Sequence, residues 1–502
     1  MFKNIEKLYK NVYAVVFLAC IAVLPMSDTI ALRNIFLVCM VLLIFVGLIS
    51  SSSIRHDFYQ ASKIIPIPVI FWITYLCVFP FWAPVPEIAW ENLRGQWGES
   101  IVTWIVGFGA AVLCMGSGPS LWKLGFASAF PLLVHLLLAG IAYFGLFSDD
   151  YYGRQSLSGL CVEILRWASG EISPIRQFHP IDNGFLGIET QPGVIGYASS
   201  MAIGIFAVCF FSAKRDNNIK EMIKASVLIV LFFLSILIAR TRGGLLFGGI
   251  VIGIAAIFFN INYRPMRVKN LGVKFSEKAS PYRNFFIFAG VLLLGCIIYA
   301  GTKADPRWLT MVDKVKAGFS IADPISTLCN GLSPAEELAI RNRLVAKPPS
   351  YVQEVIEGVQ GQDGGRVILM RAGIQLVLDN PIGLDGSRQS YERLMRVKCN
   401  GTPALHFANA HNSWIDLTLA VGWAGAILFL LMFLYFLRYS LMTACEMEFV
   451  PILAVLGVFA AFWIIRGFFD TLYREHYLQM QALIISYLYM ACSLKAKSKK
   501  SS

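Results

Sequence analysis

Long apolar stretches dominate this chain and limit what it can fold into. About twelve of them are long enough for a helix to cross a bilayer. They lie near 11–27, 30–50, 64–82, 100–116, 121–147, 191–213, 222–239, 243–260, 285–301, 412–438, 449–468 and 475–493. Only 15% of the 502 residues are charged, too few to cover a soluble protein of this size. The bilayer must therefore solvate much of the chain, and we expect an all-α polytopic membrane protein.

Basic residues predict how the chain is oriented. The net charge is +12, and lysines and arginines gather in short segments between apolar stretches. Such segments include 3–10, 214–224, 264–283 and 495–500. With twelve spans, they all fall on one face, which the positive-inside rule makes cytoplasmic. Both termini then lie in the cytoplasm. This placement explains the positive charge without a nucleic-acid partner, and the first span lacks the small-residue cleavage site of a signal peptide.

The opposite, periplasmic face carries two long segments, near 148–190 and 302–411. We therefore divide the chain into nine spans within 1–301, a helical periplasmic subdomain at 302–411, and three spans with a basic tail at 412–502. In the subdomain, Ser333 and Pro334 precede acidic residues, which is typical of a helix start. A further helix is expected from about Arg366 until Asn380 and Pro381 end it.

Two cysteines of the large loop are candidates for a disulfide. Cys329 and Cys399 both lie on the predicted periplasmic face, where disulfides form and persist. We predict that they pair. Cys161, in the other long segment, competes for either partner, and three free thiols are the alternative.

The first candidate site is a pair of arginines before two glycines, at the junction of the seventh and eighth spans. Arg240 and Arg242 lie at the outer membrane edge, where short loops rarely carry basic residues. A guanidinium offers a rigid fork of donors that suits phosphate oxygens. Gly243 and Gly244 allow a ligand to approach the backbone at a helix N-terminus, which favours an anion. The alternative is that both arginines extend to lipid headgroups.

Two further candidates stand at predicted helix starts on the same face. A neutral imidazole at His411 can take a proton from a sugar hydroxyl, as a general base must. The alternative is a structural histidine in a capped loop, since Asn412 and Ser413 are both good N-cap residues. Arg366 opposes the dipole of its own helix, which suggests a task in binding anions. An ion pair with Asp363 would explain Arg366 as well.

A basic stretch in the large loop contains Arg388, Arg393 and Arg396. It is a candidate for receiving an anionic acceptor or the lipid surface, and otherwise a solvated helix face. No residues have the spacing of a metal site, and no glycine-rich nucleotide loop is present. We therefore expect no metal, no cofactor and no nucleotide.

Taken in order, these motifs resemble the O-antigen ligase and polymerase superfamily. The match consists of Thr-Arg-Gly-Gly at 241–244, the Arg366 helix ending in Asn-Pro-Ile-Gly at 380–383, and His-Asn-Ser at 411–413. The last motif leads into Leu-Thr-Leu-Ala-Val-Gly-Trp-Ala-Gly at 417–425. The resemblance spans roughly 190–440 in motif and the whole chain in topology.

The resemblance implies an inverting, metal-independent glycosyltransferase of the C-type (GT-C) fold in the bacterial inner membrane. Its donor would be a glycan on undecaprenyl diphosphate, and its acceptor a sugar hydroxyl of the lipid A-core, within lipopolysaccharide biosynthesis. Carried over by motif, Arg242 and Arg366 would hold the diphosphate, with Arg240 beside them, and His411 would activate the acceptor. The family also contains O-antigen polymerases and protein O-oligosaccharyltransferases, and both remain alternatives.

Two observations bear on those alternatives. Polymerases often carry an Arg-x10-Gly pattern in each large outer loop, and here Arg176 and Gly187 supply only one. A ligase is therefore favoured. A secondary transporter is the alternative from another class, but transporters keep their polar sites near the midplane. His135 is the main mid-span polar residue here, and a core histidine is its simplest explanation.

Overall fold

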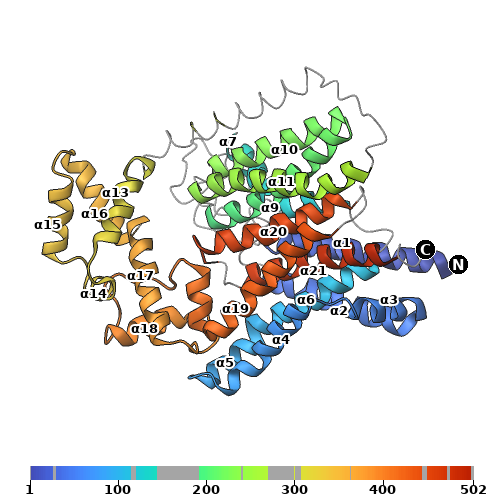
Figure 1. Cartoon of the computed structure of the whole chain (residues 1–502), viewed down its shortest axis with the longest axis horizontal. Helices are drawn as coiled ribbons and strands as arrows, with labels where there is room; N and C mark the ends of the chain where they lie inside the picture. The colour runs from blue at the N-terminus through green and yellow to red at the C-terminus, as the bar shows by residue number, and fades with distance from the viewer. Residues whose placement is uncertain are drawn as a thin grey trace, which may run out of the picture.

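The computed structural model shows a bundle of long helices with a smaller helical subdomain at one end (Figure 1). It describes residues 2–25, 30–114, 120–143, 192–238, 241–269, 307–361, 363–443, 449–471 and 475–498, together with 295 and 299. The bundle consists of α1 (Phe2–Val23), α2 (Ile30–Ser50), α3 (Ser52–Ser62), α4 (Ile67–Val78), η1 (Phe79–Phe81), α5 (Pro86–Asn92), η2 (Leu93–Trp97), α6 (Gly98–Leu113), α7 (Leu121–Tyr143), α9 (Pro192–Arg215), α10 (Ile219–Ile238), α11 (Arg242–Lys269), α19 (Ser413–Met442), α20 (Val450–Gly467) and α21 (Glu475–Ser498). The subdomain consists of α13 (Arg307–Ser320), α14 (Pro324–Asn330), α15 (Pro334–Arg343), α16 (Pro349–Gly361), α17 (Asp363–Asp379) and α18 (Ser390–Lys398).

Several of these helices can cross a membrane. Within the described ranges, six helices are long and apolar enough, or seven if α3 and α4, bent by 88°, count as one broken span. Helices also occupy the other expected spans, but α6 has only 16 residues and α10 begins with a charged turn. The expected span at 285–301 lies almost entirely outside the described residues. The chain is thus a multi-pass membrane protein, while the number of twelve spans stays a prediction.

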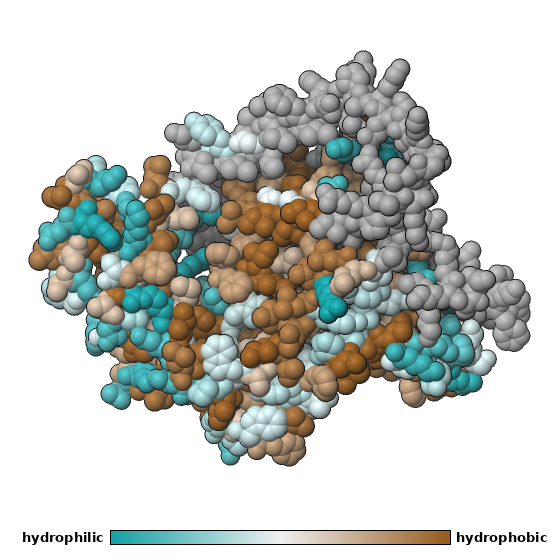
Figure 2. Space-filling view, viewed as in Figure 1, coloured by the Kyte–Doolittle hydropathy of each residue, from teal (hydrophilic) through white to brown (hydrophobic). Residues whose placement is uncertain are grey.

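The distribution of hydrophobic and hydrophilic residues on the surface agrees with a division into a membrane bundle and a subdomain. Where the bundle is drawn in colour, hydrophobic residues predominate over its middle, and hydrophilic residues gather on the subdomain (Figure 2). On α2, the outward-facing Val38, Leu42 and Phe45 are each more than half exposed, which suits contact with lipid. Both chain termini lie at the end of the bundle opposite the subdomain (Figure 1).

The subdomain has a core of its own. Buried apolar residues from α13–α18 pack together, and Ile415 and Leu419 from the start of α19 join them. Helix α15 begins with a capping box, in which Ser333 and Glu336 each bond the other's backbone N–H. Helix α17 ends at Asp379, directly before Asn380 and Pro381. Both predicted helix boundaries are therefore confirmed.

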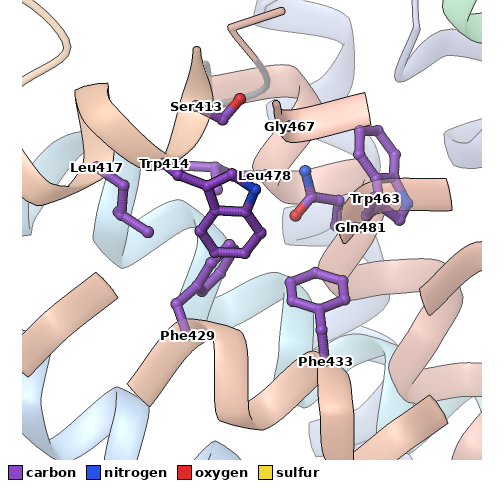
Figure 3. Close-up of a pocket in the computed structure, with 9 residues that line it drawn as sticks. All are labelled: Ser413, Trp414, Leu417, Phe429, Phe433, Trp463, Gly467, Leu478 and Gln481. Carbon is purple, nitrogen blue, oxygen red and sulfur yellow. The ribbon is translucent and has the colours of Figure 1, made fainter. Parts of the chain in front are cut away.

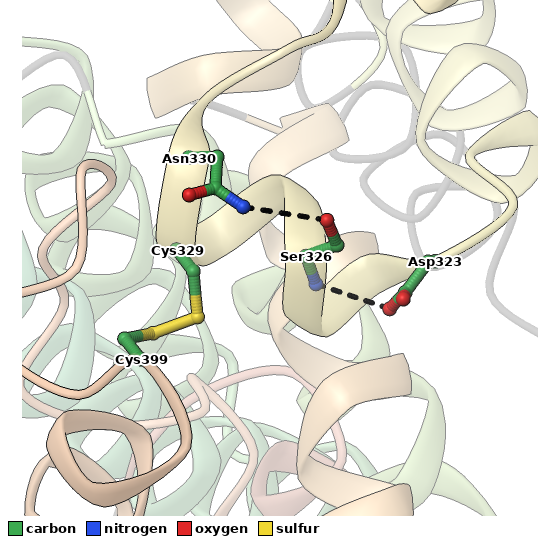
Figure 4. The surroundings of a disulfide bond; sticks show 5 residues. All are labelled: Asp323, Ser326, Cys329, Asn330 and Cys399. Carbon is green, nitrogen blue, oxygen red and sulfur yellow. Dashed lines mark hydrogen bonds between the residues drawn. A yellow bond between two sulfur atoms is a disulfide. The ribbon is translucent and has the colours of Figure 1, made fainter.

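The predicted disulfide between Cys329 and Cys399 is present (Figure 4). It joins the end of α14 to the residue that follows α18, with 70 residues of sequence separation. Backbone bonds reinforce the join, because Ala404 and Leu405 donate to carbonyl oxygens at the end of α14. Cys161 lies outside the described residues.

Replacing both cysteines by serine should destabilise the subdomain. A cross-link closing a loop of this length stabilises the fold by about 4 kcal/mol in the chain-entropy model. We expect a lower melting temperature and faster proteolysis within 330–398 in the double variant. A matched control is Cys77→Ser, which removes an exposed thiol from α4. Equal protease resistance in all three proteins would contradict a stabilising role for the disulfide.

Helix α19 is broken at Gly422, which the sequence pattern of one continuous span did not predict. Gly422 has φ +77°, and a Cβ there would lie 2.6 Å from the carbonyl carbon of Ile382. The break leaves the Ala420 oxygen to accept hydrogen bonds from Leu384 and Gly386, while Trp423 donates to Pro381. The Asn-Pro-Ile-Gly turn that ends the Arg366 helix is thus bonded directly into α19.

Candidate active site

The start of α11 presents Arg242 to the subdomain. Thr241 caps this helix by accepting a hydrogen bond from the Gly244 N–H at 3.2 Å. Gly244 lets α9 approach closely, because a Cβ there would lie 3.2 Å from the Gly196 Cα. Arg242 makes a two-pronged ion pair with Asp363, the first residue of α17, at 2.8 and 3.2 Å. The arginine expected to bind phosphate therefore joins the bundle to the subdomain. Arg240 lies outside the described residues.

Arg366 lies one turn beyond Asp363 on α17, and its side chain is exposed. The alternative that Asp363 pairs with Arg366 is wrong, since Asp363 pairs with Arg242. No carboxylate of the described residues lies within 4 Å of the Arg366 guanidinium. Its positive charge acts on Asp470, beyond the end of α20, and helps to lower the pKa of that carboxyl. Arg366 thus lies near enough for its charge to act on the carboxylate that His411 contacts.

His411 occupies an unusual backbone conformation immediately before α19. Its φ is +50°, in the left-handed region, which non-glycine residues adopt uncommonly, although histidine does so more often than most. The N-cap is Asn412, whose side-chain oxygen accepts from the N–H groups of Trp414 and Ile415 at 3.0 and 3.1 Å. The Asn412 amide also donates to the carbonyl oxygen of Phe468 after α20. Capping is therefore the task of Asn412, and the His411 side chain takes no part in it.

Asp470 faces His411 across the ends of two helices. Its Oδ1 lies 4.0 Å from His411 Nδ1, which is an ionic contact rather than a hydrogen bond. His411 Nδ1 is buried and has no hydrogen-bond partner among the described residues. Burial opposes ionisation of Asp470, but His411, Arg466 and Arg366 outweigh it and hold the pKa of the carboxyl well below its usual range. Asp470 therefore carries a negative charge beside the imidazole.

Arg466 places this carboxylate. The guanidinium is buried, lies 3.2 Å from Asp470 Oδ2, and sits over the ring of Phe247 on α11 at 4.4 Å. A Cβ at Gly243 would lie 3.7 Å from Arg466 Nη2, at ordinary van der Waals distance, so the start of α11 packs directly against this guanidinium. Sequence reasoning missed both Arg466 and Asp470. Their signal was two opposite charges four residues apart at the outer end of an apolar span, a costly position that such residues seldom occupy without a function.

A buried polar network fixes the backbone around His411. The carboxylate of Asp416 accepts from the Ala410 N–H at 2.8 Å and from the Thr471 hydroxyl at 2.9 Å. The Thr471 hydroxyl also contacts the side-chain oxygen of Asn409, which accepts from the His411 N–H at 3.1 Å. His411 and Asp470 are thus held by the same network, one from each side.

Replacing Asp470 by asparagine should lower the activity and should also make the stability of the fold depend less on pH in the acid range. Because the folded pKa is lowered, the carboxylate stabilises the fold above its unfolded pKa of ~3.9 and loses that contribution as the pH falls below it. We expect Asp470→Asn to unfold with a smaller pH dependence between pH 5 and 3 than the parent, followed by thermal melts. An unchanged pH dependence would show that Asp470 is not ionised by these neighbours.

The basic stretch of the subdomain is largely paired within itself. Arg393 bonds the fully buried Asp385. Arg396 pairs with Glu392 at 2.8 Å, and His406 contacts the same carboxylate at 3.0 Å. Arg388 is exposed. These pairs fit a solvated helix face, and acceptor binding by this stretch stays a prediction.

A small cavity lies behind the start of α19, between α19, α20 and α21 (Figure 3). Its lining includes Trp414, Phe433, Trp463 and Gln481. At about 20 Å³ it has room for one water molecule and none for a sugar.

The comparisons with known proteins agree with the motifs. Residues 227–430 match the family model of the O-antigen ligase, a region that includes Arg242, Arg366 and His411. This match supports membership of the O-antigen ligase superfamily. No curated protein matches the chain significantly. Asp470 and Arg466 lie beyond the matched region, so their assignment to this superfamily site rests on the contacts described above.

Proposed function

We propose that this superfamily member is an O-antigen ligase. It moves a glycan from undecaprenyl diphosphate to a sugar hydroxyl of the lipid A-core, at the periplasmic face of the bacterial inner membrane. The observation that carries the proposal is the contact between His411 and Asp470 at 4.0 Å, beside the buried Arg466 and within reach of the positive charge of Arg366. In the proposal, His411 is the base, Asp470 orients it, and Arg366 is a cation for the leaving group.

We assign binding of the donor diphosphate to Arg366 and Arg242. Arg366 is exposed, and its guanidinium fork suits two phosphate oxygens at once. Arg242 bonds Asp363 in the structure described here, and a phosphate would compete with that carboxylate for the same fork. As the anomeric bond breaks, negative charge grows on the diphosphate. Cations already in place stabilise this charge without rearranging.

Acceptor activation is assigned to His411. With its proton on Nδ1 towards Asp470, the imidazole offers the Nε2 lone pair to the acceptor hydroxyl. The acceptor oxygen bonds to the anomeric carbon, the carbon–oxygen bond to the diphosphate breaks, and the electron pair leaves with the diphosphate. The hydroxyl proton passes to Nε2, and Asp470 stabilises the resulting imidazolium. Attack opposite the leaving group inverts the anomeric centre.

The proposed orientation follows from the basic segments. Lysines near both termini favour the cytoplasm, and both termini lie opposite the subdomain (Figure 1). The subdomain would then lie in the periplasm, where a disulfide between Cys329 and Cys399 is stable. We assign the bundle to the GT-C class on the same grounds of topology and motif.

The test is transfer by the purified protein in lipid vesicles. Undecaprenyl-diphosphate-linked glycan, lipid A-core and an acceptor peptide are supplied together, and the products are separated by size. We expect lipopolysaccharide capped with the glycan. Longer glycans that remain on undecaprenyl diphosphate would identify a polymerase instead, and glycosylated peptide an oligosaccharyltransferase. Donor that crosses the bilayer without any new bond would indicate a transporter.

A further inference from the structure

An open pocket lies on the short helices between α4 and α6. Its volume is about 490 Å³, and it is lined by Glu87, Trp90, Glu91 and Arg94. Three of these residues belong to α5 and Arg94 to η2. In the bundle, α5 lies at the end that carries the subdomain (Figure 1). The pocket is separate from the site built around His411.

The charged side chains of the pocket form no ion pair and no side-chain hydrogen bond with the residues that the structure describes. Arg94 shares the pocket with two carboxylates, yet it forms no ion pair with any described residue. Glu87 and Glu91 likewise make no hydrogen bond to another described side chain. The ring of Trp90 is half-buried and packs edge-on against Phe81, with 5.1 Å between ring centroids, which fixes its orientation. Donors, acceptors and an aromatic surface are therefore all available to a ligand.

The backbone around the pocket is fixed to the subdomain. Gly95 interrupts the helix with φ −87° and ψ −114°, so that Arg94 stays exposed while Gln96 and Trp97 turn inward. Gln96 and Trp97 both donate to the carbonyl oxygen of Gly386, at 3.2 and 2.9 Å. The Val85 N–H donates to the Leu384 oxygen. The segment that forms the pocket is thus hydrogen-bonded to the turn that follows the Arg366 helix. The same turn is bonded to the break in α19.

We propose that this pocket is a saccharide subsite, in which one sugar ring stacks on Trp90 while Glu87, Glu91 and Arg94 bond its hydroxyls. The chemistry fits, because a pyranose has an apolar face of C–H groups and a rim of hydroxyls that both donate and accept. A carboxylate accepts from such a rim and a guanidinium donates to it. The proposal rests on the proposed function, which supplies two sources of such a ring. These are the core oligosaccharide of the acceptor and the glycan of the donor.

The experiment measures binding separately from catalysis. Core oligosaccharide with its lipid A removed, and the glycan released from the donor, are each titrated against purified protein, parent and Trp90→Ala. One arm thus tests the acceptor and the other the donor, and neither probe carries a lipid. We expect Trp90→Ala to weaken binding of one of the two by about tenfold, the loss of one well-placed aromatic contact. In the transfer assay, KM for the same substrate should rise while kcat stays near that of the parent.

The matched control is Trp82→Ala. Trp82 is an exposed tryptophan of the same connection, but its ring packs on Tyr75 and Phe79 and does not line the pocket. If both variants alter KM equally, the tryptophans act as membrane anchors and the subsite proposal is overturned. Unchanged binding of both saccharides by Trp90→Ala also overturns it. The outcome is independent of His411, because saccharide affinity is read without turnover.

Discussion

His411→Asn protein should transfer glycan ~10²–10⁴-fold more slowly than the parent, the loss expected when a general base is removed. The substitution is chosen for the backbone. His411 has φ +50°, and asparagine adopts this conformation more readily than other residues that have a Cβ. Alanine would add strain to the loss of the imidazole, so its effect would be harder to interpret. The measurement is the transfer rate as a function of pH. We expect the rate of the parent to rise with pH as His411 loses its proton, and this rise should be absent from the variant.

Two controls accompany this variant. His406→Asn removes a histidine of the same loop that contacts Glu392 and not Asp470, and its activity should stay near that of the parent. Donor affinity of His411→Asn should also be unchanged, because the arginines are intact. Near-parental transfer by His411→Asn would remove this residue from the mechanism.

Arg366→Ala should lose both transfer rate and donor affinity. Removing a preorganised donor to a developing anion costs ~10²–10³-fold in rate. Arg242→Ala should resemble it, and Arg242→Lys should restore only part of the activity, because an ammonium cannot form the forked contact. Binding is followed with undecaprenyl-diphosphate-linked glycan in vesicles, and rate by single-turnover transfer.

Asp363→Asn separates the two roles of Arg242. This variant weakens the ion pair at the start of α17 but leaves the guanidinium in place. If Arg242 binds the diphosphate, Asp363→Asn should keep most of the activity that Arg242→Ala loses. Equal losses in the two variants would mean that Arg242 only joins the subdomain to the bundle.

The candidate site residues chosen from the sequence stand at helix starts, while Arg466 and Asp470, at and beyond a helix end, were missed. Arg242, Arg366 and His411 all stand at or near helix starts, where local patterns of glycine, asparagine and acidic residues are informative. Asp470 follows the end of α20, and the only local signal is its spacing of four residues from Arg466. Its role becomes visible only when α20 places it against His411, which is 59 positions earlier in the sequence.

In the membrane helices, too, the sequence did not reveal features that depend on contacts between distant residues. Apolar length located them well, since almost every expected span that the structure describes is a helix. Hydropathy did not reveal the break at Gly422, because residues on both sides are equally apolar. The break exists because another segment, 381–386, supplies partners for the interrupted backbone, and such a distant contact leaves no periodic pattern.

The join between 381–386 and the broken helix α19 has a consequence for how the protein works. It lies between Arg366 and His411 along the chain, and its backbone bonds run to Ala420, Trp423 and Val85. A swinging motion of the subdomain would have to break these bonds together, so Arg366 and His411 keep a constant spacing. If the proposed function holds, the site is rigid and does not close around its substrates, and both lipid-linked substrates would reach it by lateral diffusion in the bilayer.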